Sequence, residues 1–136
     1  MFRSRTGCFY WPLVALALLV AIALPTVAEA ARTVIVRAGA NGKSLALKPG
    51  DTLVVRLAAN PSTGYDWAFV SRPKALRLIK STYVTSPPGR VGQGGTFSFR
   101  LRAVTGRGTL KLAYRRPWEK GKAPAQSFSI KVRVRR

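Results

Sequence analysis

Histidine is absent from this sequence of 136 residues, and cysteine and acidic residues are scarce. The single cysteine is Cys8, and 4 Asp and Glu stand against 24 Lys and Arg, which gives a formal net charge of +20. Without histidine the chain has no Ser-His or Cys-His pair for nucleophilic catalysis and no imidazole zinc site. Four carboxylates make a calcium or di-metal site hard to build. These absences exclude most classes of enzyme, and we expect no bound metal and no cofactor.

The excess of positive charge indicates a negatively charged partner. Nucleic acid, an anionic envelope surface and an acidic protein all fit a net charge of +20. The length allows one ordinary domain rather than two.

Residues 1–30 have the pattern of a secretory signal peptide. Arg3 and Arg5 form a positively charged n-region, and residues 13–24 form an uncharged apolar run of 12 residues. Ala28-Glu29-Ala30 fits an A-x-A cleavage site. We therefore expect cleavage after Ala30 and a periplasmic or secreted protein.

A membrane anchor is the alternative interpretation of the apolar run. A spanning helix needs about 20 apolar residues, and Pro12 and Pro25 bracket a shorter run. A lipoprotein anchor would need its cysteine after the run, whereas Cys8 precedes it. Both features favour a cleaved signal.

After Ala31 the apolar and polar residues alternate with a period of two, as in Leu53, Val55 and Leu57. This pattern is typical of strands with one buried and one exposed face, and no stretch shows a helical period. Turn residues separate the runs. The expected strands lie near 33–37, 44–48, 52–59, 65–71, 76–84, 96–104, 108–115 and 126–134. The fold class is all-β: an immunoglobulin-like β-sandwich of seven to eight strands over residues 31–136, with a small closed barrel as the alternative.

The first of three unusual loops is Asn60-Pro61-Ser62-Thr63-Gly64-Tyr65. Pro61 fixes its own φ and favours an extended Asn60, and Gly64 can adopt a positive φ. The hydroxyl side chains of Ser62 and Thr63 lie between Pro61 and Gly64. On the sequence pattern alone, a well-formed turn is the simpler interpretation.

The second loop is Gly92-Gln93-Gly94-Gly95, in which three glycines allow close approach of another backbone. A flexible hairpin connection is the simpler interpretation. A phosphate-binding loop does not fit, because such loops open a helix and the sequence after Gly95 predicts a strand.

The third loop contains Arg116-Pro117-Trp118. A tryptophan beside a proline in a charged loop is a poor core residue, and Trp67 on an alternating strand is the better one. Trp and Arg are the residues most enriched at binding hot spots. In a sandwich, alternate connections emerge at the same end, so we expect all three loops to lie side by side.

The three loops, in this order, resemble those of the chagasin-type inhibitors of cysteine peptidases, which carry N-P-[ST]-T-G-[FY], G-x-G-G and R-P-[WF] loops. The frame is similar too, with Trp67 after the first loop and Tyr114 before the third. The resemblance covers most of the chain after Ala31. Ser62, where the family often has Thr, and the strongly basic surface are departures.

The resemblance implies a β-sandwich that blocks papain-like cysteine peptidases without being cut. We expect reversible inhibition by a monomer that acts on no small-molecule substrate. Ser62 and Thr63 would lie over the catalytic Cys and His of the peptidase. The glycine loop would pair with backbone on the non-primed side of the cleft. Trp118 would pack on an aromatic wall on the primed side, while Arg116 would add polar contacts or hold the loop.

A cationic module for an anionic envelope polymer or nucleic acid is the alternative function. It is suggested by basic residues on outward strand faces: Arg100, Arg102, Lys111, Lys131, Arg133 and Arg135. A solvated basic surface would explain them as well. Aromatic interleaving of the kind used by single-strand binders is absent there, which argues against nucleic acid and leaves weak contact with an anionic membrane surface open.

Overall fold

The computed structural model describes residues 7, 22–25, 29–86, 92 and 94–136. The expected signal peptide therefore lies largely outside the described residues, as does Gln93, and its cleavage stays a prediction. Within the described ranges, no helix has the length and apolar character needed to cross a membrane. The strands are β1 (Thr33–Val36), β2 (Ser44–Leu47), β3 (Thr52–Ala59), β4 (Asp66–Ser71), β5 (Leu76–Thr85), β6 (Gly95–Ala103), β7 (Gly106–Arg115) and β8 (Gln126–Val134). Two short 3-10 turns, η1 (Ala38–Ala40) and η2 (Pro61–Thr63), lie between them.

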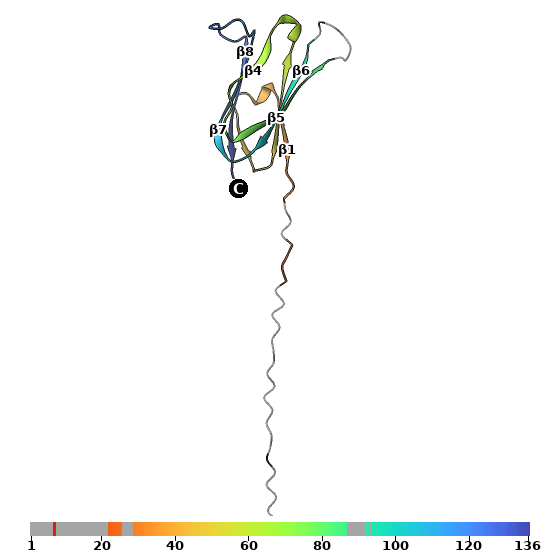
Figure 1. Ribbon diagram of the computed structural model, residues 1–136, viewed down its shortest axis with the longest axis vertical. Helices are drawn as coiled ribbons and strands as arrows, with labels where there is room; N and C mark the ends of the chain where they lie inside the picture. The colour runs from red at the N-terminus through yellow and green to blue at the C-terminus, as the bar shows by residue number, and fades with distance from the viewer. Residues whose placement is uncertain (1–6, 8–21, 26–28, 87–91, 93) are drawn as a thin grey trace, which may run out of the picture.

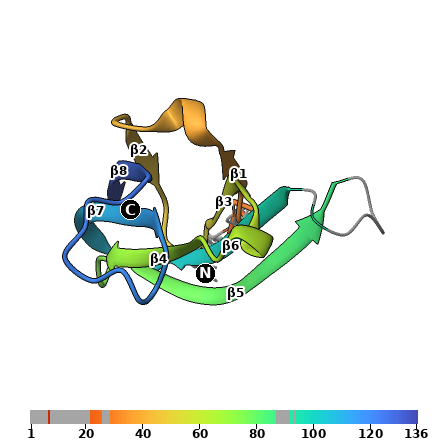
Figure 2. The same ribbon diagram turned by 90° about the horizontal axis from the view of Figure 1, so that it is seen from above.

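The eight strands form two sheets of four strands each, in the orders β1-β3-β6-β5 and β2-β8-β7-β4. Figure 2 shows the two layers from above, with η1 carrying the chain from β1 in one sheet to β2 in the other. Every expected strand is present, with ends within two residues of the predicted positions. The sandwich is confirmed, and the closed barrel is wrong because the strands divide into two separate sheets.

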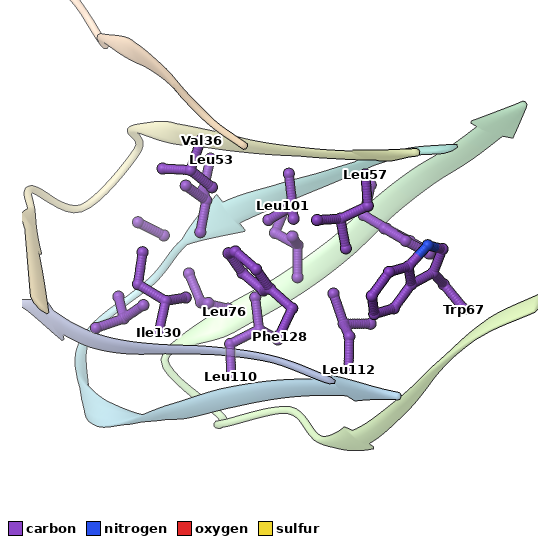
Figure 3. Packing of buried hydrophobic residues seen from close by; sticks show 14 of the residues in the cluster. Val36, Leu53, Leu57, Trp67, Leu76, Leu101, Leu110, Leu112, Phe128 and Ile130 are labelled. Carbon is purple, nitrogen blue, oxygen red and sulfur yellow. The ribbon is translucent and has the colours of Figure 1, made fainter. Parts of the chain in front are cut away.

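Apolar side chains from both sheets fill the space between the layers (Figure 3). Leu53, Val55 and Leu57 of β3 point inward, as their alternation predicted, and are at most 2% exposed. Phe128 of β8 lies in the middle of the cluster. Val54, which alternates with these inward residues, is also buried, whereas Arg56 two positions later is exposed. A single cysteine cannot form a disulfide within the chain, so the packed core stabilises the sandwich without one.

Asp51 organises the end of the sandwich at which β3 begins. Its carboxylate is buried and accepts the backbone N–H groups of Lys48 and Arg32, each at 3.0 Å. Its backbone carbonyl accepts the N–H of Ala103 at the end of β6 (2.8 Å). The hydrogen bonds from Lys48 and then Arg32 lower the pKa of the Asp51 carboxyl despite its burial, and the positive charges of the same two residues act in the same direction.

We expect Asp51→Asn to lower the free energy of unfolding at pH 7 by about 1–3 kcal/mol, because one buried backbone N–H then faces an amide donor. The folded-state pKa of Asp51 lies below its unfolded value of about 3.9. Its stabilisation is therefore complete above that value and is lost as pH falls through the folded pKa. Urea denaturation at pH 7, 4 and 2.5 should show the difference between wild type and variant shrinking at the lowest pH.

The control is Asp66→Asn, which removes the charge of an exposed side chain whose hydrogen bond from the adjacent Trp67 N–H (2.7 Å) an amide oxygen can also accept. It should change the unfolding free energy by less than about 1 kcal/mol. Equal losses in both variants, or a difference at Asp51 that does not depend on pH, would contradict this role.

Candidate functional site

All three unusual loops lie at one end of the sandwich. The register pairs Ala59 with Gly95, which places the beginning of the first loop beside the end of the second. It also pairs Asp66 with Arg115, which places the end of the first loop beside the start of the third. Figure 1 shows the first and third loops together at the end away from the C-terminus. The expected side-by-side arrangement is confirmed for the described residues, and we call residues 60–65, 92–95 and 116–118 the loop edge.

The first loop is a single 3-10 turn closed by its own side chains. Asn60 lies outside the α region that proline disfavours in the preceding residue, although its ψ is below the extended range (φ −135°, ψ 88°), and Gly64 is left-handed (φ 82°). The Ser62 hydroxyl donates to Asn60 Oδ1 (2.5 Å), and the Thr63 hydroxyl donates to the Asn60 carbonyl (2.6 Å). Both residues are exposed. Because both hydroxyl protons are used internally, the two oxygens face a partner chiefly as acceptors.

Aromatic side chains support this turn from inside the sandwich. The Asn60 N–H donates to the Tyr114 hydroxyl (2.9 Å), and Trp67 Nε1 donates to the Ala58 carbonyl (3.0 Å). The Tyr114 ring packs between those of Tyr65 and Trp67, with centroids 5.3 and 5.1 Å away. Trp67 is 6% exposed, so its predicted core position is confirmed. These contacts connect the two sheets directly below the turn.

Arg116 joins the third loop to the first. Its Nε donates to the Thr63 carbonyl (3.1 Å), and its guanidinium carbon lies 4.6 Å from the centroid of the Tyr65 ring. Glu119 Oε1 lies 3.5 Å from Nη1 of the same side chain. A planar guanidinium can make all three contacts at once, whereas a lysine could not. Of the two roles that the resemblance gave Arg116, these contacts favour holding the loop.

Trp118 is 68% exposed although it touches the first loop. A Cβ placed on Gly64 would lie 2.6 Å from Cη2 of Trp118. Gly64 is therefore required twice, once for its positive φ and once for the space that the indole occupies. The sequence predicted an exposed tryptophan, but its contact with Gly64 was not foreseen.

The three glycines of the second loop are each required for a different structural reason. Gly92 has a positive φ of 80° and open space where a side chain would be. A Cβ on Gly94 would lie 3.3 Å from the Ala59 carbonyl oxygen, and one on Gly95 would collide with the backbone carbonyl oxygen of Val84 on the paired strand. Gly95 is the first residue of β6, so it serves the sheet as well as the loop. Gln93, the fourth expected site residue of this loop, lies outside the described residues.

The loop edge presents backbone, hydroxyl groups and one large apolar ring. Among its described residues, no nucleophile is paired with a base. Across the described ranges, no three Cys, Asp or Glu side chains lie close enough together to hold a metal ion. This chemistry suits contact with another protein surface rather than catalysis.

Known proteins share both the sequence and the fold. The chagasin family peptidase inhibitor I42 model matches residues 46–132, which include the whole loop edge. Amoebiasin-2 of Entamoeba histolytica is 36% identical over 88 residues, covering 62% of this chain and 72% of that protein. Amoebiasin-1 of the same organism is 30% identical over 95 residues, covering 69% and 92%.

A solved structure agrees with these matches. The crystal structure of the cysteine protease inhibitor EhICP2 from Entamoeba histolytica superposes with a TM-score of 0.70 at 32% identity, covering 76% of this chain and 96% of that one. The relatives are inhibitors and not enzymes, in agreement with the missing histidine. The chain belongs to the chagasin family of peptidase inhibitors, I42, and is a cysteine protease inhibitor of that family.

Proposed function

We propose that this protein is exported and reversibly inhibits papain-like cysteine peptidases by placing the loop edge in the active-site cleft. The observation that carries the proposal is the exposed indole of Trp118 (68%) held against Gly64 beside a braced turn. Tryptophan is among the residues most enriched at interface hot spots, so an exposed indole in this loop is suited to contact with a partner protein. A ring that is already held in place loses little freedom on binding, about 0.5–1.5 kcal/mol less than a free side chain.

The first loop fills the centre of the cleft without serving as a substrate. A scissile segment must be extended, but Pro61–Thr63 forms a 3-10 turn. The hydrogen bonds of Ser62 and Thr63 to Asn60 resist its opening. Ser62 and Thr63 then lie over the catalytic Cys and His of the peptidase. This protein has no histidine, so the reactive pair belongs entirely to the partner.

The two outer loops contact the walls of the cleft. Trp118 packs on the primed side, and the glycine loop pairs with backbone on the non-primed side. The Ser86 N–H, just after β5, donates to the Gly94 carbonyl (3.1 Å), just before β6. This hydrogen bond holds the base of the connection that carries the glycine loop. An interface of about 800 Å² per partner would suit a contact of this kind.

Export is part of the proposal and rests on residues 1–30. Cleavage after Ala30 leaves 22 Lys and Arg against 3 Asp and Glu, a net charge of +19. The product would act in the periplasm or outside the cell. Export is tested separately from inhibition, by determining the N-terminus of the protein recovered from outside the cytoplasm. An N-terminus at Ala31 is the expected result.

We expect Trp118→Ala and Thr63→Ala to weaken inhibition of papain, and Trp118→Ala to do so by about 2–4 kcal/mol, the range of an interface hot spot. Losses of this kind arise mainly from faster dissociation. Titration of papain with the purified protein, followed by stopped-flow association and dissociation rates, measures both effects.

The control is Val104→Ala, which removes an exposed apolar side chain outside the loop edge. It should leave the inhibition constant unchanged. No inhibition by the wild type at tens of micromolar would overturn the function. Unchanged potency in both loop variants would overturn the roles given to the loop edge.

Arg116→Lys separates holding the loop from contacting the peptidase. The variant keeps the positive charge but loses the planar guanidinium group that contacts Thr63, Tyr65 and Glu119. If Arg116 holds the loop, fewer free molecules are in the binding conformation, and the association rate falls by about threefold or more. Hydrogen exchange of the Gly64 amide in the free protein should also become faster.

Arg115→Lys is the matched control one residue earlier, at an exposed position facing Asp66 across the strand pair. It should change neither the association rate nor the exchange. An Arg116→Lys variant with normal exchange and only faster dissociation would instead show direct contact with the peptidase.

A further inference from the structure

The outer face of β2, β8 and β7 carries a hollow of about 700 Å³. Its lining includes side chains from three adjacent strands: Ser44, Ala46, Arg107, Thr109, Lys131 and Arg133. We call these six residues the basic trough. We propose that the basic trough binds a linear acidic polysaccharide. This inference is independent of peptidase inhibition.

The strand register explains how the hollow arises. Arg133 lies between Ala46 and Arg107, and Lys131 lies between Ser44 and Thr109. Each row therefore combines small side chains with long cationic ones. Positions two residues apart on a strand are separated by about 6.7 Å, and neighbouring strands by about 4.8 Å. Guanidinium and ammonium groups of the trough thus stand close enough together to meet successive anionic groups of one chain.

The charges of the basic trough have no carboxylate partner in the part of the chain that the structure describes. Arg107 and Arg133 lie directly opposite one another on paired strands, which is destabilising for like charges. The four acidic residues of the sequence, Glu29, Asp51, Asp66 and Glu119, all lie outside β2, β7 and β8. None of the ion pairs found in the described part of the chain involves Arg107, Lys131 or Arg133. A bound anion would relieve this repulsion, whereas the fold gains nothing from it.

The shape and composition of the face favour a polysaccharide over other polyanions. The aromatic residues of β2, β7 and β8 are Tyr114 and Phe128, and both are buried, so no ring is available to stack on bases. None of the large apolar side chains found exposed in the described residues belongs to these three strands, so nothing inserts into a bilayer. A hollow admits a single chain better than a flat membrane. Arginine forks and hydroxyl groups suit sulfate and carboxylate groups.

The basic trough lies away from the loop edge. Arg107 pairs with Arg133 near one end of the β7–β8 hairpin, and Tyr114 pairs with Gln126 at the other. The nearer row of the trough, Thr109 and Lys131, is five residues of strand from Tyr114, which is about 17 Å. A polysaccharide in the trough and a peptidase at the loop edge can therefore be bound at the same time.

The test measures binding of a size-defined heparin octasaccharide to the purified protein by calorimetry at several salt concentrations. The triple variant Arg107→Gln, Lys131→Gln, Arg133→Gln should bind about 10-fold more weakly or worse. Its affinity should also depend less steeply on salt, because fewer ion contacts form. Inhibition of papain should stay within twofold of the wild-type value, so that failure here and failure of the inhibitor proposal are distinguishable.

The matched control is Arg56→Gln, Arg77→Gln, Arg102→Gln, three exposed cations on the other sheet. It removes the same charge and should change heparin affinity less than threefold. Equal losses in both triple variants would overturn the proposal, because net charge alone would then explain binding. Tighter binding of a single-stranded oligonucleotide of matched charge, or of phosphatidylglycerol vesicles, would also overturn it.

A single Arg107→Gln variant covers the case in which the triple variant fails to fold. It should weaken heparin binding by about threefold and raise the melting temperature at low salt, because it removes the like-charge pair with Arg133. A lower melting temperature with unchanged heparin affinity would show that Arg107 serves the fold and would overturn the proposal.

Discussion

The loop edge depends on the end of strand β7 and the residues that follow it. Within five residues this segment supplies the Tyr114 hydroxyl to Asn60, the Arg116 guanidinium to Thr63 and the Trp118 ring to Gly64. β7 belongs to one sheet, and the first loop starts from β3 in the other. The same segment therefore joins the sheets and sets the position of the first loop. Because Tyr114 is itself part of the core, the packing of the sandwich extends directly into the loop edge.

The molecule separates its stabilising and binding features in space. Asp51 joins the ends of β2 and β6 to the beginnings of β1 and β3 through backbone hydrogen bonds. The opposite ends of β3, β5 and β7 lead into the loop edge. Between these two ends lies an apolar core without a disulfide. The loops can therefore be specialised for contact at one end of the sandwich, while the hydrogen bonds of Asp51 hold the other end.

The net charge of +20 has a clearer meaning once its location is known. At the loop edge, Arg116 is engaged by Thr63, Tyr65 and Glu119 and is only half-exposed. The cations without carboxylate partners stand instead in rows on the outer sheet faces. Basicity is therefore a property of the sides of the sandwich, and the loop edge acts through shape and an exposed ring. The two surfaces can serve different partners.

The sequence by itself determined the all-β fold, the place of each strand and the division between Trp67 in the core and Trp118 outside it. Period-two alternation and turn residues are local signals, so they could be interpreted without the tertiary structure. The order of the three loop motifs was equally local and indicated the family.

Only the tertiary structure decided how those parts meet. Arg116 and Thr63 are separated by 53 residues, and Tyr114 and Asn60 by 54, yet each pair shares a hydrogen bond. The basic trough likewise exists only because β2, β8 and β7 are neighbours in one sheet. Contacts between residues so far apart in the chain depend on strand order and register. Strand order and register are set by the packing of the whole core, so the alternation within a single strand cannot predict them.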